Sequence, residues 1–309
     1  MIDVSSLTKR YGEKTAVDDL SFVVRPGIVT GFLGPNGSGK STTMRLIIGL
    51  DAPTSGGVTV GGKPYREHVA PLHEVGVLLE ARAVHPGRSA YNHLLALAQT
   101  HGIPHARVDE LIELAGLGGV ARKRVGQFSL GMGQRLGIAA ALLGDPNVVI
   151  LDEPINGLDP DGILWIRNLM KALAAEGRTV FLSSHLMSEM AQTADHLLVI
   201  ARGRIIADSS TDEFVNGNAA PSIRVRALES SYLADALTKR GALVEGAPDG
   251  CMVVTGLDAA AVGGTASAHG ITLIELVSQV SSLEEAFFDL TRDETDYHAR
   301  QLAGSTKGN

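Results

Sequence analysis

Length, composition and charge set the first limits on this chain. It has 309 residues, 44% of them hydrophobic, which is enough apolar material for one large domain and a small one without cross-links. Asp and Glu number 34 against 27 Lys and Arg, so the formal net charge is −7, and no long Lys/Arg-rich block stands out. This charge does not favour a nucleic-acid or anionic-membrane surface, and we expect no nucleic-acid partner.

Cysteine content and the start of the chain bear on location. Cys251 is the one cysteine, so no internal disulfide can form. The first residues lack the basic-then-apolar order of a secretory signal, and no run reaches the roughly 18 to 20 apolar residues of a membrane span. We expect a cytosolic protein that reaches a membrane only through a partner.

The strongest motif is a glycine-rich loop between a predicted strand at residues 28–33 and a predicted helix. Met44, Ile47 and Ile48 recur with the spacing of an amphipathic helix after the loop. The loop itself fits the phosphate-loop pattern G-x-x-x-x-G-K-[ST] with Gly34, Pro35, Asn36, Gly37, Ser38, Gly39, Lys40, Ser41 and Thr42. The motif therefore stands in the strand-loop-helix context that it requires.

The residue types of this loop predict phosphate binding. Glycines let successive backbone N–H groups turn inward as an anion nest, and the helix N-terminus near Lys40 adds a partial positive charge. Lys40 can reach β- and γ-phosphate oxygens, and the Ser41 hydroxyl can supply a ligand to Mg²⁺. A plain glycine-rich turn is the alternative, and the Lys-Ser pair with its strand and helix disfavours it.

Strands are predicted before the loop and helices after it. Residues 2–7, 15–24 and 28–33 have strand patterns, and Tyr11 lies in the first turn, where an aromatic ring can stack on a base or simply pack. Residues 75–79 form a buried strand that ends at Glu80. From about residue 81 to 144 the periodicity is mainly helical.

A second group of polar residues follows two buried strands. Asp152 and Glu153 end the apolar run at residues 147–151, and His185 follows the run at 179–183. Ligands bind at the carboxyl ends of parallel strands, so we expect Asp152 and Glu153 beside the phosphate loop of a neighbouring strand. Asp152 can hold Mg²⁺, Glu153 can orient or deprotonate a water, and His185 can reach a γ-phosphate if the strands are neighbours.

The chain divides near residues 217–221, where small and turn-forming residues cluster. We predict a nucleotide-binding domain over residues 1–216 and a small α+β domain over 222–292. The predicted order in the second domain is βαββαβ, which is that of a ferredoxin-like unit. Residues 293–309 are polar and are expected to form a flexible tail.

Together, these motifs resemble the nucleotide-binding subunit of ABC transporters over about residues 2–216. The resemblance implies an α/β P-loop NTPase fold of the ABC ATPase type, a mixed sheet with an antiparallel β subdomain and a helical subdomain. Residues 34–42 match Walker A and residues 148–153 match Walker B with its catalytic glutamate. Asp159 matches the D-loop, His185 the H-loop histidine, and Tyr11 the adenine-stacking aromatic.

Two positions depart from the family pattern. The signature L-S-G-G-Q aligns with residues 128–132, where only Ser129 and Gly131 keep the family residue. By resemblance this signature meets ATP on an opposite subunit, which implies a second copy of the chain or a partner cassette. Glu80 stands where the family has the Q-loop glutamine; a carboxylate can still ligate Mg²⁺, or it can point to solvent.

These departures and residues 282–288 look like the branch of ABC ATPases that serves drug-resistance and antibiotic or lipid exporters of the ABC-2 type. This implies an ATP-hydrolysing motor, peripheral on the inner face of the cell membrane and bound to separate polytopic membrane subunits. The resemblance places the docking loop at residues 81–93, with Val84 and Leu94 as candidate contacts. The alternatives are a soluble ABC ATPase acting on ribosomes or DNA, and an ATPase regulated by a ligand of residues 222–290.

Overall fold

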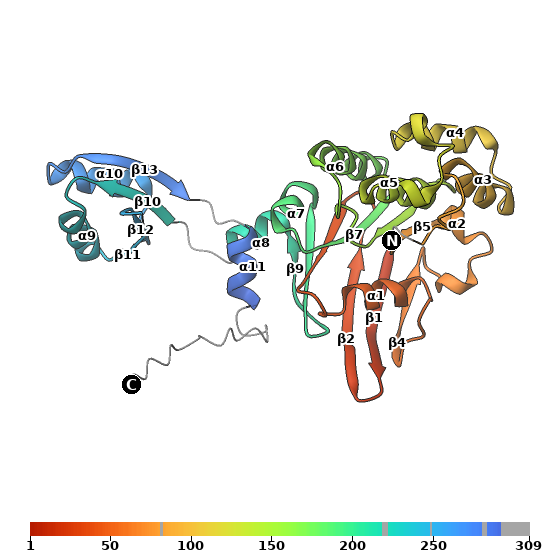
Figure 1. Cartoon of the computed structure of the whole chain (residues 1–309). Coiled ribbons are helices and arrows are strands. Elements are labelled where there is room, and N and C mark those ends of the chain that lie inside the picture. The colour runs from red at the N-terminus through yellow and green to blue at the C-terminus, as the bar shows by residue number, and fades with distance from the viewer. Residues whose placement is uncertain (81–82, 218–221, 248, 280–282, 292–309) are drawn as a thin grey trace, which may run out of the picture. The chain divides into compact units, whose positions relative to one another are not determined.

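The computed structural model describes residues 1–80, 83–217, 222–247, 249–279 and 283–291 (Figure 1). They form two compact units, the first built mainly from Met1–His185 and Leu198–Asp208, the second from Leu186–Leu197 and Ser209–Asp289. The second unit therefore includes segments that precede residue 216, and the predicted domain boundary stays a prediction. The predicted tail at residues 293–309 lies outside the described residues.

A six-stranded sheet forms the centre of the first unit. Its order is β5-β6-β7-β3-β8-β9, and the pairs β5/β6, β6/β7 and β7/β3 are parallel. The strands are β3 (Val29–Leu33), β5 (Val75–Leu78), β6 (Val148–Leu151), β7 (Thr179–Ser184), β8 (His196–Ala201) and β9 (Arg204–Ser210). Every residue of β3, β6 and β7 is buried, as expected for strands covered on both faces.

The strand order corrects one expectation. The strand before Asp152 was expected beside the strand before the phosphate loop, but β7 lies between β6 and β3. Pairing partners of this kind are set by long-range packing, which a local pattern does not encode. Since β7 ends at Ser184, His185 emerges between the two other functional strand ends.

A three-stranded antiparallel sheet packs on this centre. It has the order β2-β1-β4, with β1 (Ile2–Tyr11), β2 (Lys14–Val24) and β4 (Ser55–Val60). Phe22 of β2 contacts Phe32 and Phe181 of the central sheet, with ring centroids 5.9 Å and 6.1 Å away. The same core takes in Met44 and Ile47 of α1 (Lys40–Ile47), so the helix that follows the phosphate loop is fixed by apolar packing.

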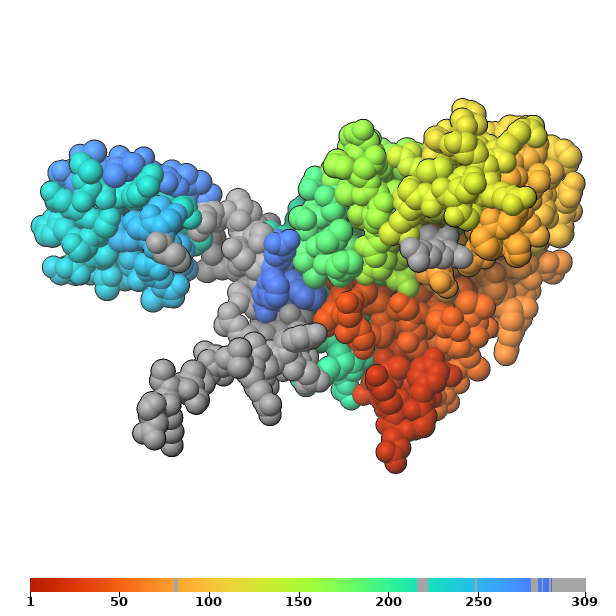
Figure 2. Space-filling model, in the orientation of Figure 1, coloured from red at the N-terminus to blue at the C-terminus, as the bar shows by residue number. Residues whose placement is uncertain are grey.

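Helices form the rest of the first unit, and the three longest of those expected between residues 81 and 144 contact one another. These are α3 (Ala90–Thr100), α4 (His105–Leu114) and α5 (Leu130–Ala141). Figure 2 shows them, in orange to yellow, above the antiparallel sheet in red. The unit also contains α2 (Pro71–Glu74), α6 (Pro160–Ala175) and short 3-10 turns at Tyr65–Glu67, Gly118–Val120 and Val125–Gln127.

The second unit has the predicted βαββαβ order. Its strands form an antiparallel sheet of order β11-β12-β10-β13, and the elements are β10 (Ser222–Ala227), α9 (Ser230–Lys239), β11 (Leu243–Gly246), β12 (Met252–Thr255), α10 (Ala259–Ala268) and β13 (Leu273–Gln279). Val225, Leu237 and Val254 are fully buried in a core of its own. The remaining helices are α7 (Met187–Thr193), α8 (Thr211–Gly217) and α11 (Leu283–Thr291). Within the described ranges, none of the helices has the length and apolar character of a membrane span.

Candidate active site

The phosphate loop begins where β3 ends and leads directly into α1. Gly37 and Gly39 have φ values of +81° and +114°, the left-handed region that glycine adopts without strain. A Cβ on Gly39 would lie 2.6 Å from the carbonyl oxygen of Ala16, so no larger residue fits there. The loop borders a cavity of about 350 Å³ lined by Tyr11, Lys14, Ala16, Asn36, Gly37, Gly39, Lys40, Ser41, Thr42 and Glu153.

Lys40 supplies a buried positive charge beneath this cavity. Its side-chain ammonium donates hydrogen bonds to the carbonyl oxygens of Gly34, at 2.6 Å, and Pro35, at 3.2 Å. Burial lowers the pKa of Lys40, and the charges of Glu153 and Asp152 offset part of that shift. An ammonium held only by neutral carbonyls retains its full charge for anionic oxygens that enter the loop.

The acid pair at the end of β6 is fixed by its neighbour β7. The Ser183 hydroxyl donates to the Asp152 carboxylate and accepts a hydrogen bond of 2.9 Å from the Glu153 backbone N–H. The Asp152 N–H in turn donates to the carbonyl of Leu78 on β5, at 2.7 Å. Asp152 is therefore held rigidly, as a metal ligand must be.

Glu153 and His185 form the pair that points to chemistry. Nδ1 of His185 lies 2.8 Å from Oε2 of Glu153, so an Nδ1–H donates to the carboxylate. The backbone of Glu153 is left-handed, with φ +50°, which is uncommon for a residue other than glycine. The Gln134 side-chain amide donates to the Glu153 carbonyl at 3.1 Å, and Ser183 holds the N–H on the other side. Strain held from both sides is typical of functional positions.

Gln134 and Ser183 were missed by the sequence reasoning. Gln134 is only 4% exposed and Ser183 is fully buried, and a buried polar side chain needs a partner. Gln134 lies five residues after Ser129, among apolar residues. Ser183 is the last residue of the apolar run before His185. Each was therefore a polar residue in a segment predicted to be buried. That pattern is the sequence signal by which both could have been recognised as functional.

Tyr11 is anchored at the edge of the cavity. Its hydroxyl donates to Asp51 at 3.0 Å. Arg45 of α1 donates two hydrogen bonds to the same carboxylate, at 2.8 Å and 3.2 Å. The Lys9 ammonium lies 4.8 Å from the ring centroid. Burial, and then the bond to Asp51, raises the pKa of Tyr11, while Arg45 lowers the pKa of Asp51. The half-exposed ring thus has a fixed position relative to the phosphate loop.

Ser129, Gly131 and Asp159 lie outside the residues that line this cavity. Ser129 caps α5 by accepting from the Met132 N–H at 3.2 Å, and Asp159 caps α6 by accepting from the Gly162 N–H at 2.9 Å. A Cβ on Gly131 would lie 2.8 Å from the carbonyl oxygen of Gly157, so the two caps are packed together. They form an exposed surface of their own.

Glu80 is also outside the cavity. It is exposed at the end of β5, and its predicted role as a metal ligand stays a prediction. The described residues contain no group of three or more His, Cys, Asp or Glu that could hold a metal by itself. The Ser41 hydroxyl in the cavity wall and the rigid Asp152 carboxylate are oxygen ligands of the kind that Mg²⁺ takes, alongside the phosphates of a substrate.

The known protein families that match this chain fall separately in its two predicted domains. A family model described as "ABC transporter" matches residues 17–156, and one described as a domain of unknown function matches residues 221–284. The chain is 42% identical over 221 residues to the bacitracin transport ATP-binding protein BcrA of Bacillus licheniformis, covering 71% of this chain and 72% of that protein. It is 36% identical to the lantibiotic transport ATP-binding protein SrtF of Streptococcus pyogenes, covering 69% and 92%.

A solved structure of an ABC transporter subunit has the same fold as part of this chain. The ATP-binding subunit of an ABC transporter superposes with a TM-score of 0.64 at 27% identity, covering 70% of this chain and 92% of that one.

Proposed function

The chain belongs to the ATP-binding subunits of ABC transporters, and from this premise we propose that it is the ATP-hydrolysing motor of an exporter. The pairing of Glu153 with His185 beside the phosphate-loop cavity carries the proposal. The names of the relatives, bacitracin and lantibiotic transport proteins, support an antibiotic as cargo, with a lipid as the other class. The motor would sit peripherally on the inner face of the membrane, bound to separate membrane subunits.

Hydrolysis follows from the placement of the charges. Lys40 holds the β- and γ-phosphates of ATP at the loop, and the Tyr11 ring stacks on the adenine. Ser41 and Asp152 would hold Mg²⁺, which when bound neutralises phosphate charge. Glu153 accepts a hydrogen bond from the attacking water and polarises it for in-line attack. His185 orients Glu153 and faces the charge that develops on the γ-phosphate.

A second cassette completes the site. Ser129 and Asp159 are exposed and Gly131 is partly buried, and none of the three lines their own chain's cavity. The N-terminus of the 12-residue helix α5 presents free N–H groups to an anion. We infer that these residues contact the γ-phosphate bound to another copy or to a partner cassette, so that ATP closes the dimer and hydrolysis opens it.

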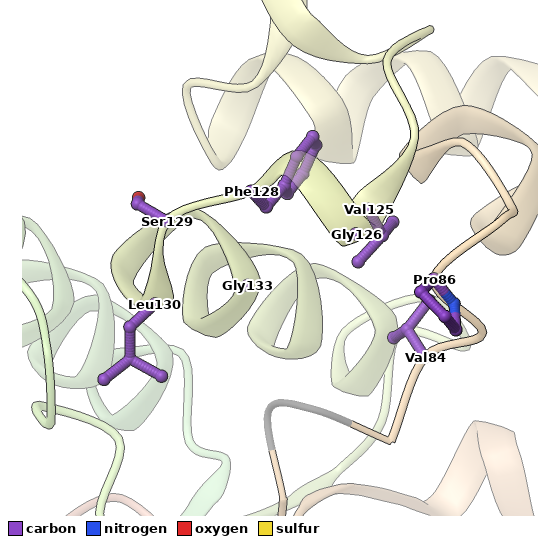
Figure 3. A pocket seen from close by; sticks show the side chains of 8 residues that line it. All are labelled: Val84, Pro86, Val125, Gly126, Phe128, Ser129, Leu130 and Gly133. Carbon is purple, nitrogen blue, oxygen red and sulfur yellow. The ribbon is translucent and has the colours of Figure 1, made fainter.

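The membrane subunit docks at the loop after Glu80, of which residues 81–82 lie outside the described residues. An apolar groove of about 370 Å³ runs along this loop and reaches the start of α5; the groove residues are Val84, Pro86, Val125, Gly126, Phe128, Ser129, Leu130 and Gly133 (Figure 3). A segment seated at the end of the groove lined by Val84, Pro86 and Val125 would touch the docking loop and leave Ser129 to the nucleotide of the opposite cassette. Leu94, the other candidate contact, is fully buried and is not available for docking.

The experiment that tests this function is isolation of a tagged Glu153→Gln protein from membranes of its own cells in ATP and Mg²⁺. A polytopic membrane protein among the bound proteins, identified by mass, supports the exporter. Ribosomal proteins or DNA in its place would move the chain to the soluble class of ABC ATPases.

A further inference from the structure

A second, basic cavity adjoins the apolar groove. It is a shallow, open hollow of about 600 Å³ on the surface, lined by His85, Gly87, Arg88, Ser89, Asn92, Arg122 and Arg124, of which all but Ser89 are exposed. Val84 and Pro86 line the groove while His85 and Gly87 line the basic cavity, so alternate residues of one loop face the two spaces. Whatever seats on this loop therefore meets an apolar surface and a basic surface side by side.

The backbone that presents the arginines is held in place. The Val125 N–H donates to the carbonyl of Arg88 and the Gly126 N–H to that of Pro86, both at 2.9 Å. A β-bridge joins Ser89 to Arg124. These bonds tie the docking loop to the segment before the signature, so the backbone at Arg88 keeps its distance from the backbone at Arg124.

Arg122 is also held through its side chain. Its guanidinium lies 5.3 Å from the centroid of the Tyr91 ring, a cation–π contact that leaves the charge unneutralised.

The arginines of this cavity differ from others in the same unit. Arg45 pairs with Asp51, and Arg178 with Asp145. Over the described part of the chain, Arg88, Arg122 and Arg124 make no ion pair with a carboxylate.

Two acids, Asp109 and Glu113, line a neighbouring cavity together with Arg122. Among the ion pairs of the described residues, neither of them pairs with Arg122. In a chain of net charge −7, such an unneutralised basic cluster is a local positive field that attracts an anionic partner.

We propose that Arg88, Arg122 and Arg124 bind carboxylates of the membrane subunit. The occupant is a cytoplasmic segment that places apolar side chains in the groove and Asp or Glu over the arginines, whose planar forks match a carboxylate. The apolar groove beside the basic cavity favours such an amphipathic protein segment over a lipid headgroup. This inference rests on the proposed function, since an exporter subunit is what brings the segment to this loop.

The test uses the full-length chain with a photoreactive amino acid at Asn92, and inverted membrane vesicles from cells of its own organism in which the gene for this chain has been deleted. We expect cross-linking to a segment of a polytopic membrane protein that contains Asp or Glu. Arg88→Glu and Arg124→Glu should each weaken vesicle binding by about tenfold or more, with basal ATP turnover unchanged. Lys171→Glu on α6 makes the same change of charge at another exposed position and should bind normally.

Each of the other possible outcomes would contradict a specific part of the proposal. If the charge-reversed proteins bind like Lys171→Glu while cross-links to the membrane protein persist, the acidic contact is wrong and the exporter function stands. If the cross-links go to lipid, the occupant is a headgroup phosphate and the proposal is wrong. If no membrane component is cross-linked, the proposed function fails as well. Arg in place of the cross-linked Asp or Glu should restore binding of Arg88→Glu.

Discussion

The two units of this protein differ in where one group of charged residues lies. In the first, Lys40, Asp152, Glu153 and His185 come from the ends of three strands and converge beside one cavity. In the second, Arg224 on the sheet pairs with carboxylates of its own domain, Asp249 and Glu275. Charges that face a cavity can act on a substrate, whereas charges that satisfy one another hold a surface together. A structural role for the second unit stays our prediction, with ligand-dependent regulation as the alternative.

The largest effect is expected at Glu153. Glu153→Gln removes the general base, so ATP turnover should fall by roughly 10² to 10⁴-fold while ATP binding is kept. Phosphate release and nucleotide titration measure the two quantities. Glu275→Gln is the matched control in the second unit, and it should leave turnover unchanged. Normal turnover by Glu153→Gln would show that another group activates the water.

Core substitutions should separate the two units in thermal unfolding. Phe181→Ala removes a ring packed 5.3 Å from that of Phe32, and should cost about 3–5 kcal/mol of the first unit's stability. Leu237→Ala should cost about 2–5 kcal/mol in the second. Calorimetry with and without ATP identifies the transitions, because ATP stabilises only the unit that binds it. A single transition shifted by both substitutions would mean that the units do not unfold independently.

Lys40 has a smaller effect and a definite pH dependence. Lys40→Met should weaken ATP binding by about 10- to 100-fold, since a hydrogen bond to a charged group contributes roughly 1.5–3 kcal/mol. Because burial lowers the pKa of Lys40, the unfolded chain binds its proton more readily, and the free energy of unfolding rises with pH between the lowered pKa and the ordinary value of 10.5. Denaturant titrations should show this rise in the wild-type protein and its loss in Lys40→Met.

The smallest effect concerns the anchoring of Tyr11. Tyr11→Phe removes the donor and Asp51→Ala the acceptor of the bond that fixes the ring, and each should weaken ATP binding by about 2- to 10-fold. Inorganic tripolyphosphate, which has no base, should bind both variants as it binds the wild type. The double variant should be no weaker than the single ones, because both act through one contact. A loss of tripolyphosphate binding would instead indicate a disturbed phosphate loop.

Local patterns predicted much of the fold and the site. The phosphate loop and the acid pair were identifiable because each is a contiguous run at a strand end, and the βαββαβ order followed from alternating periodicities. The placement of β7 between β6 and β3 could not be predicted from local patterns, because strand pairing depends on distant residues. For the same reason the contact of Gln134 with the Glu153 backbone, and the burial of Leu94, could be seen only in three dimensions.

The most direct test of the central claim compares ATP turnover of the purified chain with two additions. One is inverted membrane vesicles from cells of its own organism in which the gene for this chain has been deleted, and the other is ribosomes from the same cells. We predict that vesicles change the turnover of the wild-type chain, that ribosomes do not, and that Glu153→Gln stays inactive with both. Stimulation by ribosomes and indifference to vesicles would contradict the assignment as an exporter motor.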